Sequence, residues 1–168
     1  MKAPGFSLIE LIIVLAVLGI GLTLALPSIA PAIERTEAAT TASRLQIALN
    51  QARLGAINSS LPTVVCPSLD RLTCSRSIDW RGGVLLFADA NNDGQRQPDE
   101  PLQQYFALGN QPVFSSTGRI RARFLPDGTA HGANLTLTVC AGDAQATRLI
   151  IANAGRIRIE RERAEPRC

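Results

Sequence analysis

The sequence predicts an α+β protein in which one long N-terminal helix packs against an antiparallel β-sheet head. Three observations lead to this fold class. An uncharged apolar run lies near the start, an apolar stripe with helical spacing follows it, and short alternating segments fill the rest of the chain. With 168 residues, the chain is long enough for one domain and an appendage.

The first part of the predicted helix is apolar enough to cross a membrane. No charged residue occurs from Leu11 to Leu26, and the run consists almost entirely of Leu, Ile, Val, Ala and Gly. About 20 apolar residues span the core of a bilayer, and the run reaches that length together with Phe6–Ile9. We therefore expect a transmembrane segment over residues 6–27.

The helix is expected to continue as an amphipathic segment over residues 28–60. Pro27 and Pro31 predict a kink or a loosened turn within it, whereas Asn58–Ser60 and Pro62 are expected to end it. Apolar residues recur at steps of three and four, which indicates one buried helix face. This stripe consists of Ile33, Ala38, Ala42, Leu45, Ala48, Leu49, Ala52, Ala56 and Ile57.

Residues 61–168 are predicted to form a β-rich globular head. Clusters of Gly, Pro, Asn and Asp separate short segments that are rich in β-branched or alternating residues. No connection is long enough for a crossover helix, so we expect antiparallel pairing. The expected strands are Thr63–Cys66, Val84–Ala88, Gln103–Ala107, Arg119–Leu125, Asn134–Cys140, Arg148–Ala152 and Arg156–Arg161.

Four cysteines follow the apolar segment and would share one compartment after membrane insertion. Four cysteines permit three pairings. We favour Cys66–Cys74 and Cys140–Cys168, because the second bond would attach the free C-terminus to the sheet. This pattern fits an exported, oxidising location. A zinc site is the competing interpretation, although the chain has no CxxC motif and only His131 to assist.

A specific motif precedes the apolar run. It reads Gly5-Phe6-Ser7-Leu8-Ile9-Glu10-Leu11, and a glutamate at the edge of a membrane helix is costly unless it has a partner. The alternative explanation for Glu10 is an interfacial residue that snorkels to the headgroups. The alternative for the whole segment is a simple single-pass anchor. Together with the apolar helix and Pro27, the motif resembles the type IV pilin and type II secretion pseudopilin superfamily.

That resemblance implies processing and assembly. A prepilin peptidase would cut between Gly5 and Phe6, remove residues 1–5 as a leader on the cytoplasmic side, and methylate the new amino group of Phe6. Glu10 would then pair with the Phe6 ammonium group of a neighbouring subunit in the filament. A buried charge is tolerable when an opposite charge meets it, so this pairing is physically reasonable.

Motifs in the predicted head indicate which family within this superfamily the chain resembles. Thr63–Ser68, Cys74, Asp79–Phe87, Asp89–Gly94 and Gly155–Arg158 occur in an order similar to that of the GspH/FimT family of minor pilins and pseudopilins. This resemblance implies a type IV pilin-like fold and a subunit that sits in the inner membrane with its head in the periplasm. Its partners would be the prepilin peptidase and other pilins or pseudopilins.

The loop that starts at Asp89 matches the EF-hand calcium pattern in its spacing. Aspartate and asparagine alternate before Gly94, and Glu100 is the twelfth residue. Against calcium, a predicted strand precedes the loop and Gln97 stands where an acid would help; a polar hairpin loop explains the same residues. The candidate calcium ligands are Asp89, Asn91, Asp93, Gln95 and Glu100.

Arginines alternate with other residues in two predicted strands. Residues 117–168 carry nine arginines against five acids, which makes this third of the chain basic within a net charge of +3. If the two strands are neighbours, the arginines would line one surface and bind phosphates without reading sequence. The candidates for binding double-stranded DNA are Arg119, Arg121, Arg123, Arg156 and Arg158.

In minor pilins of this family that take part in transformation, a Gly-Arg-x-Arg element near the C-terminus is tied to DNA binding. Arg156 and Arg158 match this element. The alternative is a solvated strand face whose arginines pair with Glu160, Glu162 and Glu165.

The sequence therefore predicts a minor pilin that assembles into or initiates a type IV pilus, with DNA uptake as an added role. The rival interpretation is a tip pseudopilin of a type II secretion system, and a third is an isolated membrane-anchored binding module. We predict no enzymatic activity, because Ser59, Ser60 and Ser68 lack a histidine–acid context. No cofactor is expected apart from the calcium considered above.

Overall fold

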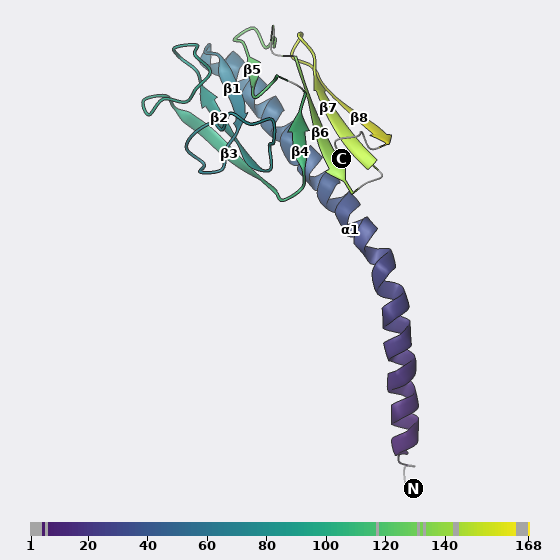
Figure 1. Ribbon diagram of the computed structural model, residues 1–168. Helices are drawn as coiled ribbons and strands as arrows, with labels where there is room; N and C mark the ends of the chain where they lie inside the picture. The colour runs from purple at the N-terminus through teal and green to yellow at the C-terminus, as the bar shows by residue number, and fades with distance from the viewer. Residues whose placement is uncertain are drawn as a thin grey trace.

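The structure is a computed structural model that describes residues 5, 7–116, 118–130, 132, 134–142, 145–163 and 168. At residues 22–29, 145, 162 and 163 it describes the main chain alone. One helix, α1 (Leu8–Ser59), extends from a head made of two β-sheets (Figure 1). The predicted α+β fold with a long helix against an antiparallel head is confirmed.

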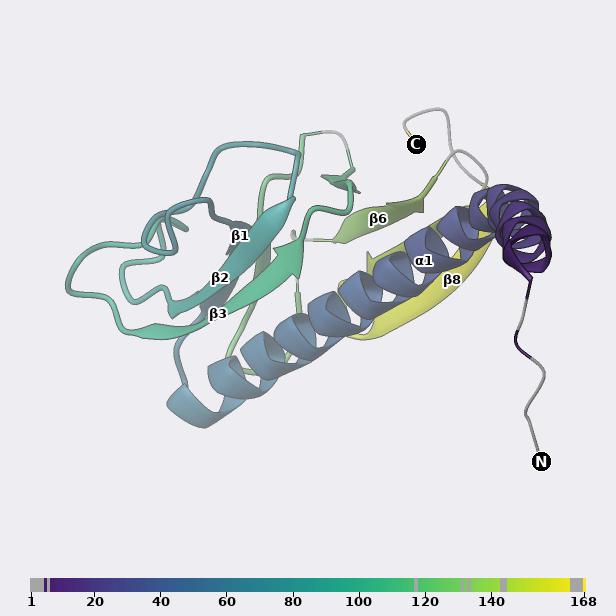
Figure 2. The same cartoon turned by 90° about the horizontal axis from the view of Figure 1, so that it is seen from below.

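Helix α1 has 52 residues and defined caps at both ends. Ser7 is the N-cap, and its hydroxyl accepts a hydrogen bond from the Glu10 main-chain N–H. Ser60 ends the helix with a φ of 55°, in the left-handed conformation common at helix C-termini. Figures 1 and 2 together show that the helix changes direction between its free N-terminal half and the half under the head, which fits the predicted kink near Pro27 and Pro31.

The first sheet is formed by four antiparallel strands in the order β3-β2-β1-β5. Strand β1 pairs with β2 from Thr63↔Ala88 to Pro67↔Val84 and with β5 on its other side. The bounds are β1 Thr63–Pro67, β2 Gly82–Ala88, β3 Leu102–Gly109 and β5 Ala122–Phe124.

The second sheet is also antiparallel and has the order β4-β6-β7-β8. Strands β6 and β7 pair over seven residues, and so do β7 and β8, which makes β8 the outer edge. The bounds are β4 Val113–Ser115, β6 Leu135–Ala141, β7 Gln145–Ile151 and β8 Ile157–Arg163.

The C-terminal half of α1 forms one core with both sheets. Small residues on its covered face let the strands approach closely, and Leu45 and Leu49 fill the space between helix and sheets. Ile33 and Ile57, predicted on this face, are instead exposed at 53% and 43%. Thr41 was not predicted on the buried face but is buried there, and its hydroxyl donates a hydrogen bond to the Leu108 carbonyl at 3.0 Å.

The structure differs from the predicted strands in two places. Strand β4 was missed, since three residues carry almost no alternation signal. Residues 119–121 were expected in a strand, yet they precede β5 in an irregular segment. Gly118 has a φ of 80° and the Arg119 N–H donates to the Ser116 carbonyl, so a turn occupies the start of the expected strand.

The structure contains the two predicted disulfide bonds. Cys66 is bonded to Cys74 and Cys140 to Cys168, each with 5.5 Å between the two Cα atoms. No cysteine is left free, so the zinc interpretation is wrong. The second bond attaches the end of the chain to β6, the strand that packs on α1.

Candidate functional site

The N-terminal segment places Glu10 in the first turn of α1. Its side chain is exposed, and a carboxylate here interacts favourably with the positive end of the helix dipole. Gly5 is exposed as well, whereas Phe6 lies outside the described residues. The predicted peptidase cleavage after Gly5, the methylation of Phe6 and the pairing of Glu10 with a neighbour therefore stay predictions.

The described N-terminal half of α1 exposes apolar side chains on every face. From Leu8 to Ile20 the large apolar residues are between 50% and 76% exposed. A continuous apolar surface of this kind indicates an interaction site. Within the described residues, no helix is both long and apolar enough to span a bilayer. The predicted transmembrane segment 6–27 includes Phe6 and the side chains of residues 22–27, which the structure does not describe, so this segment stays a prediction.

Arg156 directly precedes β8, and Arg158 is the second residue of that strand. Arg156 directly follows Gly155, whose backbone packs against Gly128 and Arg53 near the end of α1. Within β8 the register shows the predicted alternation: Ile157 and Ile159 lie opposite the buried Ile151 and Leu149, although Ile159 is 40% exposed, and Arg158 belongs to the other face of the strand.

The acids in and after β8 are the alternative partners of these arginines. Glu160 lies opposite Arg148 and forms an ion pair with it, at 3.7 Å between Nη2 and Oε2. The side chains of Glu162 and Glu165 lie outside the described residues. Arg156 and Arg158 are both exposed at the start of the edge strand β8.

The other three candidate arginines belong to a different part of the head. Strand β5 is the edge of the first sheet and β8 the far edge of the second, so the two arginine segments are not neighbours and the condition for a shared arginine surface is not met. Arg119 donates to the Gly132 carbonyl at 2.8 Å, and Arg121 donates to the carbonyls of Asp93 and Gly94. With Arg123, these residues line a cavity of about 430 Å³.

The loop from Asp89 to Glu100 contains the residues of the predicted calcium pattern. Asp89 and Glu100 are buried, whereas Asn91, Asp93 and Gln95 are exposed. Hydrogen bonds to the Gln95 N–H and to the side chains of Gln97 and Asn91 lower the pKa of the Asp93 carboxyl. Within the described residues, no three Asp, Glu, His or Cys side chains already form a group that could hold a metal ion.

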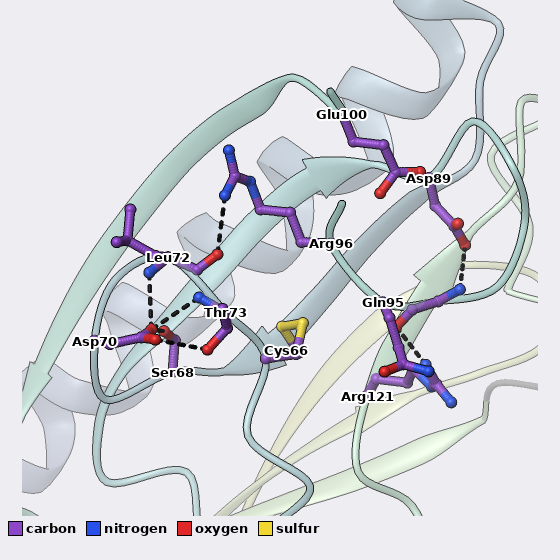
Figure 3. The surroundings of a disulfide bond; sticks show 12 residues. Cys66, Ser68, Asp70, Leu72, Thr73, Asp89, Gln95, Arg96, Glu100 and Arg121 are labelled. Carbon is purple, nitrogen blue, oxygen red and sulfur yellow. Dashed lines mark hydrogen bonds between the residues drawn. A yellow bond between two sulfur atoms is a disulfide. The ribbon is translucent and has the colours of Figure 1, made fainter. Parts of the chain in front are cut away.

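A turn centred on Asp70 was missed by the sequence reasoning. Its carboxylate accepts hydrogen bonds from the main-chain N–H of Leu72 and Thr73, both at 2.8 Å, and from the Thr73 hydroxyl at 2.6 Å (Figure 3). These bonds, with the Thr73 side chain first, hold the pKa of Asp70 far below its usual value. The signal was Ser-x-Asp within a short disulfide loop, a typical turn former.

A long helix with a free apolar half and a β-sheet head packed on its other half defines a pilin-like protein. The "Prokaryotic N-terminal methylation motif" matches residues 1–26, and the family "Type II transport protein GspH" matches residues 41–155. The chain belongs to the GspH family, as its resemblance to GspH/FimT minor pilins implied. This is a family of pilin structural subunits.

Individual relatives agree with this assignment. The chain is 32% identical to the pilin-like protein PilA1 of Thermus thermophilus, over 95% of this chain and all of that protein. Two crystal structures of the type IV minor pilin FimU of Pseudomonas aeruginosa share the fold, with TM-scores of 0.55 and 0.56. They are 18% and 20% identical and cover 72% and 76% of this chain and 90% of FimU.

Proposed function

We propose that the chain is a minor pilin of a type IV pilus, a structural subunit without catalytic activity of its own. After cleavage behind Gly5, residues 6–27 hold it in the inner membrane with the head in the periplasm. It then enters the filament beside other pilins. The observation that supports this best is the apolar half of α1, exposed on all faces, with Glu10 in its first turn.

The physical argument concerns what can cover this half of the helix. Each large apolar side chain gains about 1.5–3 kcal/mol when it leaves water, so ten of them strongly favour a lipid or helical environment. A carboxylate in that environment needs a cation. The amino group of Phe6 in a neighbouring subunit is a suitable one, because both charges lie near the start of their helices.

The family description also fits the rival function, a tip pseudopilin of a type II secretion system. Deletion of the gene in its source bacterium separates the two. We expect fewer surface pili and unchanged levels of secreted proteins, with restoration by the wild-type gene. Normal piliation with a loss of secreted proteins would favour the secretion system instead.

Double-stranded DNA is a second proposed ligand, supported by the exposed Arg156 and Arg158 at the start of β8. Arg156 directly follows Gly155, which packs against Gly128 and Arg53 near the C-terminal end of α1, the end opposite the predicted membrane segment. The ion pair between Glu160 and Arg148 leaves that acid engaged elsewhere. Contacts to phosphates alone would make binding independent of base sequence.

The test uses the full chain in detergent and measures retention of duplex DNA over a range of salt concentrations. Replacing both residues, R156Q and R158Q, should weaken binding and reduce the slope of log K against log salt by about 1.8, or 0.9 for each phosphate contact. Arg161→Gln is the matched control, since Arg161 is exposed on the opposite face of the same strand. Equal retention by wild type and double variant at every salt concentration would refute DNA binding here.

A further inference from the structure

The loop between β2 and β3 holds two buried carboxylates. Asp89 is the residue after β2 and has no exposed surface, and Glu100 is only 4% exposed. Both point into the loop: Asp89 Oδ2 accepts the Gly94 N–H at 3.0 Å, and the Glu100 oxygens accept the N–H groups of Ala90 and Gln97, both at 2.9 Å. Figure 3 shows the two carboxylates on the same side of the loop.

One oxygen of this pair has no partner. Asp89 Oδ1 is buried and accepts no hydrogen bond in the described structure. The Asp89 side chain is directed into the loop, because its Oδ2 accepts the Gly94 N–H there. Leaving a buried acceptor unsatisfied is costly, more so when the group is charged. The oxygen therefore requires a ligand that accepts its lone pairs.

The nearby cations do not neutralise the pair. Three arginines lie in or beside the loop, yet each donates to a neutral oxygen: Arg121 to the Gly94 carbonyl, Arg76 to the Gln95 side chain and Arg96 to the Leu72 carbonyl. Among the described residues, neither Asp89 nor Glu100 forms an ion pair. A cation in the loop would satisfy the unpartnered Asp89 Oδ1 and offset the negative charge of the two carboxylates together.

The remaining loop residues define which cation fits. Asn91 and Asp93 follow Asp89 at two-residue steps, and Asn92 and Gly94 have φ values of 66° and 71°, which curl the main chain around the two carboxylates. The available donors are all oxygen atoms, the ligands that calcium prefers. We propose that this loop binds one calcium ion through Asp89, Asn91, Asp93, the Gln95 main-chain oxygen and Glu100.

Binding requires one rearrangement. The three carboxylates are not gathered in a metal-binding group in the described structure. Asp93 is the exposed one, and it would exchange its hydrogen bonds with Asn91, Gln95 and Gln97 for a place at the ion. Asp89 and Glu100 are already held in place. The ion would fix the loop next to the start of β1, since the Asp89 N–H donates at 2.8 Å to the carbonyl of Pro62, the residue before that strand. The site would have three carboxylates, and its other ligands would be neutral. We expect it to bind calcium with a Kd of about 10⁻⁴–10⁻³ M, the range of calcium sites that work outside the cytoplasm.

The full chain in detergent, stripped with a chelator, tests the site by calorimetric titration with calcium chloride and by thermal unfolding. We expect one calcium ion per chain and a Tm that rises with calcium but not with equal magnesium. Asp93→Asn should weaken calcium affinity at least about tenfold, whereas the exposed neighbour Asp99, replaced by Asn, should leave it unchanged.

Three results would overturn the site: no calcium effect on the wild-type chain, an equal effect of magnesium, or equal losses in the Asp93 and Asp99 variants. The last would indicate general surface charge in place of coordination. Because Asp93 is exposed, its replacement should not unfold the head, which keeps the comparison interpretable. None of these measurements depends on pilus assembly or DNA binding.

Discussion

The two halves of α1 belong to one continuous helix but bury their side chains in opposite ways. In the C-terminal half, Ala38 to Ala56 supply a narrow buried face against both sheets, while polar side chains face solvent. In the described part of the N-terminal half, no side chain is covered by the head, and large apolar residues surround the helix. Figures 1 and 2 show this half leaving the head entirely.

The contrast indicates that the two halves of α1 have different roles, one in folding of the head and the other in assembly. The covered half contributes to the stability of the head, because its leucines and alanines fill a shared core. The free half contributes nothing to that core and is available for lipid or for other subunits. Substitutions in the two halves should therefore change different measurements.

The largest effect on stability is expected for Leu49→Ala. Leu49 is fully buried between the helix and the sheets, and truncation of such a leucine costs about 2–5 kcal/mol through lost burial and a residual cavity. Leu15→Ala is the matched control, since Leu15 is 60% exposed in the free half and its loss should change the free energy of unfolding by less than about 0.5 kcal/mol.

Denaturant unfolding of the full chain in detergent, with the disulfides intact, measures both variants. Similar losses for Leu49→Ala and Leu15→Ala would mean that the free half is part of the cooperative unit. That result would contradict the separation of folding from assembly.

A smaller effect is expected for Asp70→Asn in the Cys66–Cys74 loop. The folded pKa of Asp70 lies below its value of about 3.9 in the unfolded chain, so its stabilising contribution is complete above that value. The contribution is lost as the pH falls from about 4 toward the folded pKa. We expect the variant to melt below the wild type from pH 8 to 5, and the gap to close in stronger acid.

Melting temperatures over this pH range, in the presence of a chelator, test the expectation. Asp99→Asn provides the comparison, because Asp99 is exposed and forms no part of the Asp70 turn. A gap for Asp70→Asn that stayed constant to the lowest pH would show that the ionised carboxylate is not responsible.

The elements with strong local signals were predictable from the sequence. The helix was predicted from its apolar run, its period and the residues that end it, and the long strands were predicted from alternation and turn residues. Strand β4 was not predictable, because it depends on pairing with β6 across the chain. The two-sheet arrangement was also missed, since strand order depends on long-range contacts that local patterns do not specify.

The arginines show the same limit for the candidate site. Residues 119–123 and 156–161 share one alternating pattern, so the sequence could not distinguish them. In the structure Arg119 and Arg121 are engaged by main-chain carbonyls, whereas Arg156 and Arg158 are exposed at the start of β8. The difference comes from the turn at Gly118 and from sheet order, both of which are tertiary features.

Glu10 provides the most direct test of the claim that the free half of α1 assembles the chain into a filament. Filaments sheared from cells that express the wild type, Glu10→Ala or Glu34→Ala are compared by immunoblot with the membrane fraction. Glu34 is an exposed glutamate of the same helix beyond the apolar run, which makes it the matched control. We predict the wild type and Glu34→Ala in filaments, with Glu10→Ala processed but retained in the membrane. Incorporation of Glu10→Ala at the wild-type level would contradict the account.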